Sequence, residues 1–560
     1  MKKISLFLIL LTALVIPTLS AGKNTGRKGP LNPATLNERT HQYRQLLSLL
    51  QSQYVDSLDM EALITTGIRA MLNTIDPYTE YYNTDNLDEL TTVSSGAYGG
   101  IGSAILRRDT VVVMSEPYFG KPAYEAGVRH GDIILEIDDY VLPAKDIDVS
   151  DVSNRLKGNP GSKVRVKVRR PWIENGKDSI FVFDITRRKV SIDPLPYFTM
   201  FDDGIAYFEV STFNINTAEE IRKAFSEIRA REGKNLKGVI IDLRDNGGGL
   251  LESAVNLLSM FLNRGTTVVE TRYRDGSVQT YKTRKSPVDI KIPVVVLVNG
   301  NTASASEIVS GAIQDLDRGV IMGQRTYGKG LVQTSGAVGY GNVLKYTTGK
   351  YYLPSGRLVQ ALDYRDSDGR PTLIPDSLTH EFHTLTGRIV RDGRGISPDV
   401  TLPADNSSQL VWQLFSDQWI SDYANRYRNR HDKMPDITDS VVIQFIFAEF
   451  KNFVNPEKLQ YGRASKAGID YLREATRIEG LVSDSVTTAI DGLEKMLKHD
   501  LSHELDANRE EIEKMLLLAI AERYVSPREV SEIIIAGDEE VMEARKLLLD
   551  SERYRSLLFP

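Results

Sequence analysis

Ser304 and Lys329 are the residues whose types and setting could carry out nucleophilic catalysis. Ser304 follows an apolar β-branched run, 294–298, and a polar turn, and it opens a stretch with apolar residues at helical spacing. At the start of a helix, oriented N–H groups beside the Ser304 hydroxyl could stabilise an oxyanion. Lys329 lies between two glycines on a later connection. Because this stretch contains no histidine, a lysine with a lowered pKa is the base available to the serine.

Two other interpretations fit the same residues. In the plainer one, Ser304 only caps a helix and Lys329 is a surface lysine. In the other, residues 323–329 match G-x-x-x-x-G-K, which is typical of a phosphate-binding loop. That pattern is incomplete, because Gly330 occupies the position of the magnesium-binding Ser or Thr, and the residues after it predict a strand where a helix is required.

The string from Asn301 to Gln333 resembles the active-site segment of the C-terminal processing peptidases, which are tail-specific serine proteases of the S41 type. The resemblance implies that Ser304 is the nucleophile and Lys329 the general base of a Ser–Lys dyad. It also implies that Gln333 is a third polar residue of the site, which would position the ammonium group of Lys329. The family needs no metal or organic cofactor, and none is expected here.

A glycine-rich segment earlier in the chain completes the expected site. Residues 238–243 are typical of a buried strand, and a glycine loop and a helical pattern follow, an order that presents N–H groups at a helix start. The string DLRDNGGG resembles the family's DLRxNxGG element. The resemblance implies an oxyanion hole made by the N–H of Ala305 and by that of Gly247 or Gly248, with both glycines remaining candidates.

Spacing elsewhere does not predict a metal site. Asp242 and Asp245 lack further carboxylates or histidines at ligand spacing, so we expect a salt bridge or a turn role for them. His499 and His503 stand four residues apart on a helical pattern, but no third ligand accompanies them. The chain contains no cysteine, which excludes disulfides and thiol chemistry.

A PDZ-like unit is expected before the catalytic segments. Residues 88–188 combine β-branched runs with glycine turns and resemble a PDZ domain. Such domains add a chain end as an extra strand and hold its carboxylate on N–H groups of a glycine-rich loop. The matching positions, and so the candidate peptide-binding residues, are Gly99, Gly100, Ile101 and Gly102.

The N-terminus predicts export. A short basic region is followed by the apolar run 4–16 and by small residues near Ala21, as in a secretory signal peptide. An uncleaved membrane anchor is the second interpretation, although the run is short for a spanning helix. We expect an exported protein, periplasmic in a two-membraned bacterium, without a stable membrane span after cleavage. The net charge of −6 does not indicate a nucleic-acid partner.

The expected architecture is a multidomain α/β protein with helical segments at both ends, and the family resemblance implies a ClpP/crotonase-like protease core with an inserted-type PDZ domain. At 560 residues the chain is too long for a single core. The predicted units are a signal peptide (1–21), an N-terminal helical region (35–87), the PDZ-like domain (88–188), the serine protease core (189–403) and a helical C-terminal domain (404–560).

The expected function is therefore that of an exported serine endopeptidase that binds protein C-terminal tails and cleaves through an acyl-enzyme. Its partners would be protein substrates with accessible tails, with a regulatory adaptor and a second copy of the chain as further candidates. An inactive peptide-binding scaffold and another acyl-transfer enzyme on the same fold stay open as alternatives.

Overall fold

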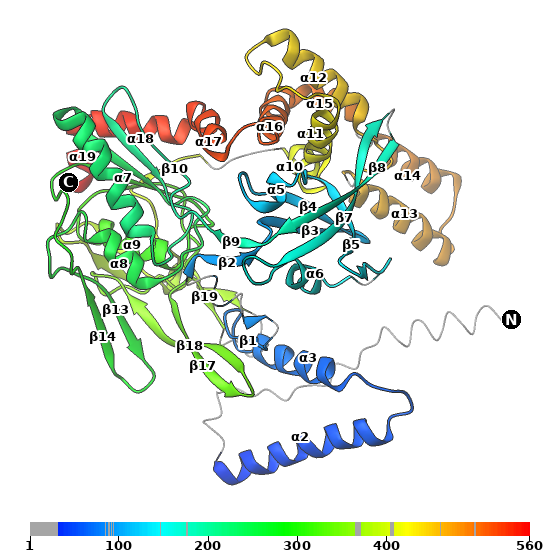
Figure 1. Ribbon diagram of the computed structural model, residues 1–560, viewed down its shortest axis with the longest axis horizontal. Helices are drawn as coiled ribbons and strands as arrows, with labels where there is room; N and C mark the ends of the chain where they lie inside the picture. Colours follow the sequence, from blue (N-terminus) through cyan, green and yellow to red (C-terminus); the bar gives the residue numbers. More distant parts are fainter. Residues whose placement is uncertain are drawn as a thin grey trace.

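The computed structural model describes residues 32–559, apart from 85, 88–89, 91, 93–94, 146, 175–176, 365–370, 404–407, 460 and 498–499. The expected signal peptide and His499 lie outside the described residues. A β-rich domain, an α/β core and a helical domain follow one another along the chain (Figure 1).

A six-stranded sheet forms the centre of the α/β core. Its strands run in the order β10-β11-β12-β15-β16-β23, and all neighbours are parallel except β10 and β11. All side chains of β12 and β15 are buried, as expected for a parallel sheet that is covered on both faces. The strand bounds are β10 Tyr197–Met200, β11 Ile205–Glu209, β12 Gly238–Asp242, β15 Val294–Val298, β16 Val320–Gly323 and β23 Val400–Thr401.

Helices from distant parts of the chain cover the two faces of this sheet. On one face, Phe225, Leu258 and Ile308 pack in one core cluster with strand residues of β12 and β15. On the other face, Val541 and Leu548 pack in a second cluster with residues of the same strands. The first face is covered by α7 Thr217–Glu232, α8 Leu251–Leu258 and α9 Ala305–Asp315, and the second by α18 Glu539–Leu549 and α19 Ser551–Leu558. The last helices of the chain therefore complete the core (Figure 1).

A second sheet joins the N-terminal region to the core. The strand β18 pairs with β1, β13 and β17, so a strand from the beginning of the chain is hydrogen-bonded to a late hairpin. Two helices, α2 and α3, precede β1 in the chain. Helix α2 buries none of its residues and lies apart from the other elements in Figure 1. The elements here are α2 Pro33–Gln53, α3 Met60–Asn73, β1 Glu80–Tyr82, β13 Thr267–Tyr273, β14 Val278–Lys282, β17 Leu331–Gly339 and β18 Asn342–Tyr352, with the short pairs β19 Leu362–Asp363 and β20 Thr372–Leu373, and β21 Glu381–His383 and β22 Ile389–Arg391.

The domain expected to be PDZ-like is a separate antiparallel sheet with its own core. Val112, Ile134, Val166 and Ile185 are buried in one cluster because alternate residues of each strand face inward. A two-stranded ribbon, β2 with β9, connects it to the core. The elements are β2 Ala97–Gly100, β3 Ser103–Arg108, β4 Val111–Pro117, α5 Pro122–Glu125, β5 Asp132–Ile137, β6 Tyr140–Val141, α6 Val149–Leu156, β7 Lys163–Glu174, β8 Lys177–Thr186 and β9 Arg188–Ser191.

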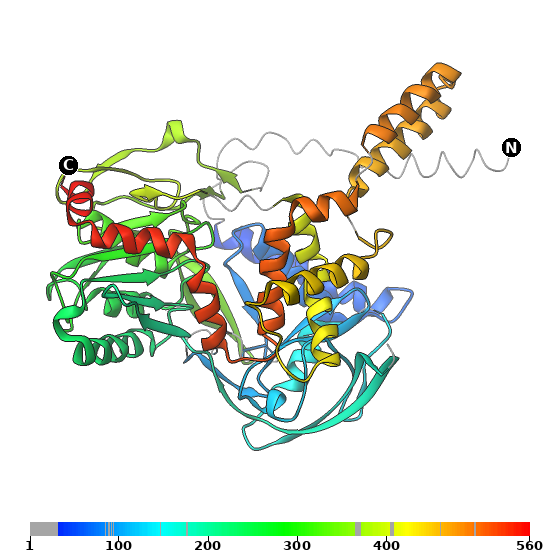
Figure 2. The same cartoon turned by 90° about the horizontal axis from the view of Figure 1, so that it is seen from above.

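The C-terminal part of the chain is helical, as its apolar periodicity predicts. Leu414, Phe447, Phe450 and Leu516 belong to a core cluster of its own. The α13–α14 hairpin projects away from the rest of the molecule (Figure 2). The helices are α10 Gln409–Ser416, α11 Trp419–Arg430, α12 Ser440–Phe453, α13 Arg463–Ile478, α14 Asp484–Met496, α15 Leu501–Ala507, α16 Arg509–Ala521 and α17 Pro527–Ala536.

Polar contacts attach helix α11 to the β-rich domain. Asp422 accepts two hydrogen bonds from the guanidinium of Arg108. Asn429 accepts one from Arg129 at 3.1 Å and donates one to the carbonyl of Pro171 at 3.0 Å. The helical part of the chain therefore touches the β-rich domain through α11 and the core sheet through α18 and α19.

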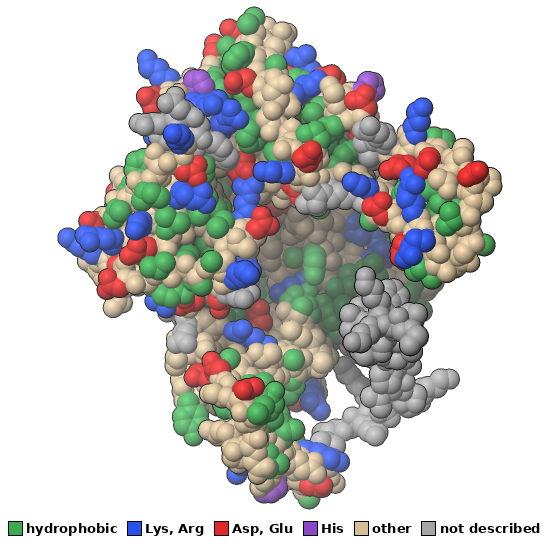
Figure 3. Space-filling view, turned by 90° about the vertical axis from the view of Figure 1, so that its right-hand side faces the viewer, with side chains coloured by type: hydrophobic (Ala, Val, Ile, Leu, Met, Phe, Trp, Pro, Cys, Tyr) green, Lys and Arg blue, Asp and Glu red, His purple; other side chains and the backbone are tan. Residues whose placement is uncertain are grey.

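The surface and the helices give two further constraints. Lys and Arg side chains are interspersed with Asp and Glu over the face in Figure 3, without a single-sign patch of the kind that binds nucleic acid. Among the helices of the described residues, none is long and apolar enough to cross a membrane.

Candidate active site

Ser304 occupies a sharp strand-to-helix turn after the carboxyl end of β15, a central strand of the core sheet. It follows β15 and is the N-cap residue of α9, with φ 57° and ψ −116°. A non-glycine residue with positive φ is uncommon and costs conformational energy, and such strain clusters at functional sites. The predicted position of Ser304 at a helix start agrees with this geometry, and its side chain is half-buried.

The glycine loop lies in contact with Ser304. A Cβ atom added to Gly248 would be 2.8 Å from the Cβ of Ser304 and 2.9 Å from the amide nitrogen of Ala305, so only glycine fits there. Gly248 also has φ +100°, whereas a Cβ added to Gly247 would have no heavy atom within 4 Å. Of the two candidate glycines, Gly248 is therefore the one beside the serine. Its N–H donates to Asn246 Oδ1 at 2.8 Å.

Lys329 lies on the connection between β16 and β17, and its amino group rests on an aromatic ring. The distance from Nζ to the centroid of the Tyr78 ring is 4.2 Å. Burial lowers the pKa of Lys329, and the nearby charge of Lys345 adds to this, while Glu80 acts in the opposite direction. Within the described chain, no hydrogen bond joins Lys329 Nζ to Ser304 Oγ.

Gln333 points to a different partner from the one that the resemblance implies. Its side-chain Nε2 donates to Thr347 Oγ1 at 3.2 Å across the β17–β18 pair. The structure therefore brings Ser304, Ala305 and Gly248 together, puts Lys329 on the neighbouring connection, and leaves Gln333 without a hydrogen bond to the lysine.

Glu307 and Tyr351 are buried residues of this site that sequence reasoning did not single out. Both link the backbone of Ser304 to the backbone of Lys329, the first through a carboxylate and the second through a hydroxyl. A local signal existed for Glu307, because Ser304-x-x-Glu307 has the spacing of a capping box. No comparable signal existed for Tyr351.

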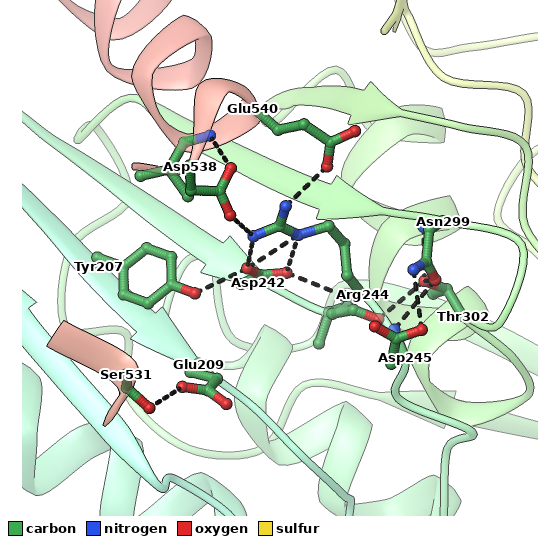
Figure 4. A network of polar contacts seen from close by, with 12 residues as sticks. Tyr207, Glu209, Asp242, Arg244, Asp245, Asn299, Thr302, Ser531, Asp538 and Glu540 are labelled. Atoms are coloured by element: carbon green, nitrogen blue, oxygen red, sulfur yellow. Dashed lines mark hydrogen bonds and ion pairs between the residues drawn. The ribbon is translucent and has the colours of Figure 1, made fainter. Parts of the chain in front are cut away.

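A charged network supports the root of the glycine loop (Figure 4). Arg244 binds Asp242 at the end of β12, and it reaches Asp538 and Glu540 at the start of α18, each at 2.7 Å. Tyr207 donates its hydroxyl to Asp242 at 2.7 Å. The salt-bridge role predicted for Asp242 is confirmed.

The turn role predicted for Asp245 is confirmed as well. Its carboxylate accepts from the side-chain amides of Asn299 and Asn301 at 3.0 and 2.8 Å, which ties the glycine loop to the turn before Ser304. Figure 4 shows Asp245 directed toward Asn299 and away from the Arg244 network.

A groove of about 350 Å³ lies in the β-rich domain between β3 and α6. Ile101 and Gly102 line it, together with residues of α6. Gly99 and Gly100 belong instead to β2, where they pair with β9. Of the four expected peptide-binding positions, two therefore face the groove and two lie in the ribbon beside it.

The described part of the chain contains no group of three His, Asp or Glu side chains that could hold a metal ion. The charged cluster around Arg244 is satisfied by ion pairs within the protein.

Three family models match successive parts of the chain. Residues 115–170 match the PDZ domain, residues 204–364 match peptidase family S41, and residues 410–548 match the probable PDZ-protease C-terminal helical domain.

Several C-terminal processing proteases are similar to the chain in sequence. The carboxy-terminal-processing protease of Bartonella bacilliformis is 30% identical over 335 residues, which cover 59% of this chain and 75% of that protein. The chloroplastic C-terminal processing peptidase of Tetradesmus obliquus is 33% identical over 319 residues, which cover 54% of this chain and 66% of that protein. A solved photosystem II D1 C-terminal processing protease is 29% identical with a TM-score of 0.36, covering 64% of this chain and 86% of that one.

The chain is thus a serine-type peptidase with a PDZ domain and a helical C-terminal domain, and it belongs to the C-terminal processing proteases of peptidase family S41.

Proposed function

We propose that this protein is an exported endopeptidase that hydrolyses peptide bonds with Ser304 and Lys329 after its PDZ domain has bound the substrate's C-terminal tail. The observation that carries the proposal is the strained turn at Ser304, where Gly248 lies against the Ser304 Cβ and the amide nitrogen of Ala305. Such a turn exposes a nucleophile next to donors for a developing oxyanion.

In the proposed reaction, neutral Lys329 takes the proton of Ser304 as the hydroxyl attacks the scissile carbonyl. The tetrahedral oxyanion is held by the N–H groups of Ala305 and Gly248. Protonated Lys329 returns its proton to the leaving amine of the substrate. A water molecule that Lys329 then deprotonates hydrolyses the acyl-enzyme. Burial supports this role for Lys329, because it lowers the pKa toward the neutral form.

Two adjustments must precede this chemistry. The Lys329 amino group has to leave the Tyr78 ring and turn toward Ser304. The Gly248 N–H has to exchange Asn246 for the oxyanion. We propose that the arrangement described above is a resting state, and that Gln333 moves from Thr347 to the Lys329 amino group when the site closes.

Tail recognition would use the groove between β3 and α6. Ile101 and Gly102 lie at its end, where backbone N–H groups can bind a terminal carboxylate. Val149 and Leu156 supply apolar walls, which favours substrates that end in an apolar residue. A chain end added to β3 would extend the sheet by one strand.

Export is supported by the basic, apolar and small-residue order of positions 1–21. The mass of the mature N-terminus, measured after expression in a two-membraned bacterium and separation of the periplasm, tests it. A protein that keeps Met1 and stays with the membrane fraction would contradict cleavage.

The catalytic proposal is tested with an unstructured protein that ends in an apolar residue, offered to the wild type and to Ser304→Ala and Lys329→Ala. Both variants should lose at least about 1,000-fold in kcat, because a nucleophile and its base act as one unit. The same substrate with an amidated or acidic tail is the control for the PDZ domain, and it should be cleaved more slowly by the wild type.

The outcomes separate the parts of the proposal. Substantial cleavage by Lys329→Ala would remove that residue from the base role. Cleavage that ignores the tail would keep the peptidase and discard tail recognition. Binding without cleavage by any form of the protein would favour the scaffold.

A further inference from the structure

Glu307 is a fully buried carboxylate that no cation contacts through a hydrogen bond in the described chain. Its Oε2 accepts the backbone N–H of Ser304 at 2.9 Å and that of Lys329 at 2.8 Å. Its Oε1 accepts the backbone N–H of Gly328 at 2.8 Å and the hydroxyl of Thr326 at 2.6 Å. The side chain is 0% exposed. Four donors from two segments of the chain thus converge on one carboxylate.

Tyr351 makes the complementary contacts from the other side. Its hydroxyl contacts the carbonyl oxygen of Ser304 at 3.3 Å and donates to that of Lys329. Tyr351 comes from β18 and is 1% exposed. The backbones of the two candidate catalytic residues are therefore tied together twice, once through their N–H groups and once through their carbonyl groups.

We propose that Glu307, in its ionised form, is a positioning residue that holds the Ser304 turn and the Lys329 connection in the mutual placement that catalysis requires. This inference rests on the proposed function, because it assumes that Ser304 and Lys329 act as a pair. Tyr351 assists from the carbonyl side. Neither Glu307 nor Tyr351 reaches the substrate or exchanges protons with it.

The charge of Glu307 matters because a carboxylate can accept from all four donors, whereas a carboxylic acid must donate from one of its oxygens. On protonation, at least one of the four donors loses its acceptor inside the protein, which is costly for a buried group. Burial raises the pKa of Glu307 to about 7, so this loss falls within the working pH range. The titratable groups that face it are Lys329 from the β16–β17 connection and Tyr351 from β18.

Protonation of Glu307 would loosen the two segments at once. The positive φ of Ser304 is maintained by its surroundings, and the Ser304 N–H bond to Glu307 is one of the constraints. The Lys329 N–H and the adjacent Gly328 N–H both donate to the same carboxylate, so it also helps to place the connection that carries Lys329. A displacement of about 1 Å between reacting groups can lower a rate about 100-fold.

The test compares Glu307→Gln with the wild type across a pH series. A glutamine can turn its amide nitrogen toward Thr326, whose hydroxyl can accept, and can keep its oxygen on Ser304 and Lys329. We expect kcat to fall about 10-fold with KM unchanged, since one donor, Gly328, loses its partner. On the acid side, log kcat should change with a slope of two protons in the wild type and one proton in Glu307→Gln, because only Lys329 still titrates.

Two further variants make the result specific. Glu252→Gln is the matched control, because Glu252 is an exposed acid in the first turn of the neighbouring helix α8 and should leave kcat and the pH profile unchanged. Tyr351→Phe removes only a hydroxyl, and it should lower kcat several-fold while the two-proton slope is retained. Thermal unfolding and binding of a tail peptide confirm that each variant is folded.

A wild-type rate and a two-proton slope in Glu307→Gln would overturn the inference. If Glu307→Gln fails to fold, Tyr351→Phe decides, and an unchanged kcat in that variant would overturn it. Ser304→Ala and Lys329→Ala are measured beside these variants. Activity in either of them would refute the Ser–Lys pair itself, which is a different failure from an insensitive Glu307.

Discussion

Two buried carboxylates, Glu307 and Asp242, secure the two loops of the active site by opposite means. Glu307 holds the Ser304 turn and is surrounded by neutral donors, so its charge depends on pH. Asp242 holds the root of the glycine loop and is paired with Arg244, whose guanidinium also binds α18 (Figure 4). Its partner is charged at every relevant pH.

The difference teaches that the two halves of the site respond to different influences. The nucleophile side can be loosened by a proton. The glycine-loop side can be disturbed by moving the C-terminal helices, because Asp538 and Glu540 begin α18 and share the guanidinium with Asp242. We therefore expect pH to act on the Ser304 turn and displacement of α18 to act on the glycine loop.

The largest expected loss of stability comes from removing Arg244, the cation that pairs with Asp242. Arg244→Met leaves Asp242 buried without its cation and next to two further acids, which should cost about 3 kcal/mol or more in the free energy of unfolding. Urea denaturation of both proteins at neutral pH measures the loss. Arg165→Met is the matched control, since Arg165 pairs with Asp184 at the surface, where the pair is screened by solvent and its loss should change stability far less. Equal losses in the two variants would contradict the distinction.

The next largest effect is the pH dependence of stability that arises from Glu307. The pKa of Glu307 is raised from 4.5 to about 7 in the folded protein, so the folded state holds this proton more tightly than the unfolded state. This tighter binding of the proton adds to the free energy of unfolding. The contribution is complete below about pH 4.5 and is lost as pH rises through 7, a change of ~3 kcal/mol. The difference in unfolding free energy between wild type and Glu307→Gln, measured from pH 4.5 to 8, should show this decline. A difference that stays flat with pH would show that Glu307 has an ordinary pKa.

The smallest expected effects come from two matched deletions of a tyrosine hydroxyl, one beside Asp242 and one beside Ser304 and Lys329. Tyr207→Phe removes a donor to Asp242, and Tyr351→Phe removes the contacts to the carbonyl groups of Ser304 and Lys329. We expect each variant to lose about 1 kcal/mol of stability. Only Tyr351→Phe should also lower kcat, because Asp242 keeps Arg244 as its main partner. A fall in kcat for Tyr207→Phe of the same size would show that both loops are equally sensitive.

Local pattern carries a large part of the fold and of the candidate site. The apolar β-branched run at 294–298 predicts a strand, which the structure shows as the buried strand β15, and Ser304 follows it at the expected helix start. The resemblance of the DLRDNGGG string to a family element implies that its glycines lie near Ala305, and a Cβ at Gly248 would collide with Ser304 and Ala305. The strand and the helix start depend on neighbouring residues, which a sequence displays directly, whereas the nearness of the glycine loop to Ser304 was expected only from the family resemblance.

What the sequence leaves open depends on contacts between distant segments. Which of Gly247 and Gly248 lies against Ser304 is seen only once the fold places the two loops together. The ring of Tyr78 lies under the Lys329 amino group only because β1 pairs with β18, and no local pattern predicts that pairing. Arg244 finds Asp538 almost three hundred residues away.

Gln333 is a different case, because its partner depends on conformation. The resemblance implies a contact with the lysine, and the described geometry has the side chain on Thr347, on the adjacent strand. Side-chain placement on a paired strand follows the register, and that register shifts between Val332 and Gln333. A sequence pattern does not reveal such a shift.

The helical C-terminal domain is fastened at both ends, to the PDZ domain by α11 and to the core sheet by α18 and α19. We expect these attachments to limit the separation between the groove of the PDZ domain and Ser304. A substrate whose end occupies the groove must cover that separation with extended chain, at about 3.3–3.6 Å per residue. We expect the scissile bond to be selected by its distance from the substrate's end, so that this domain determines the length of the fragment released.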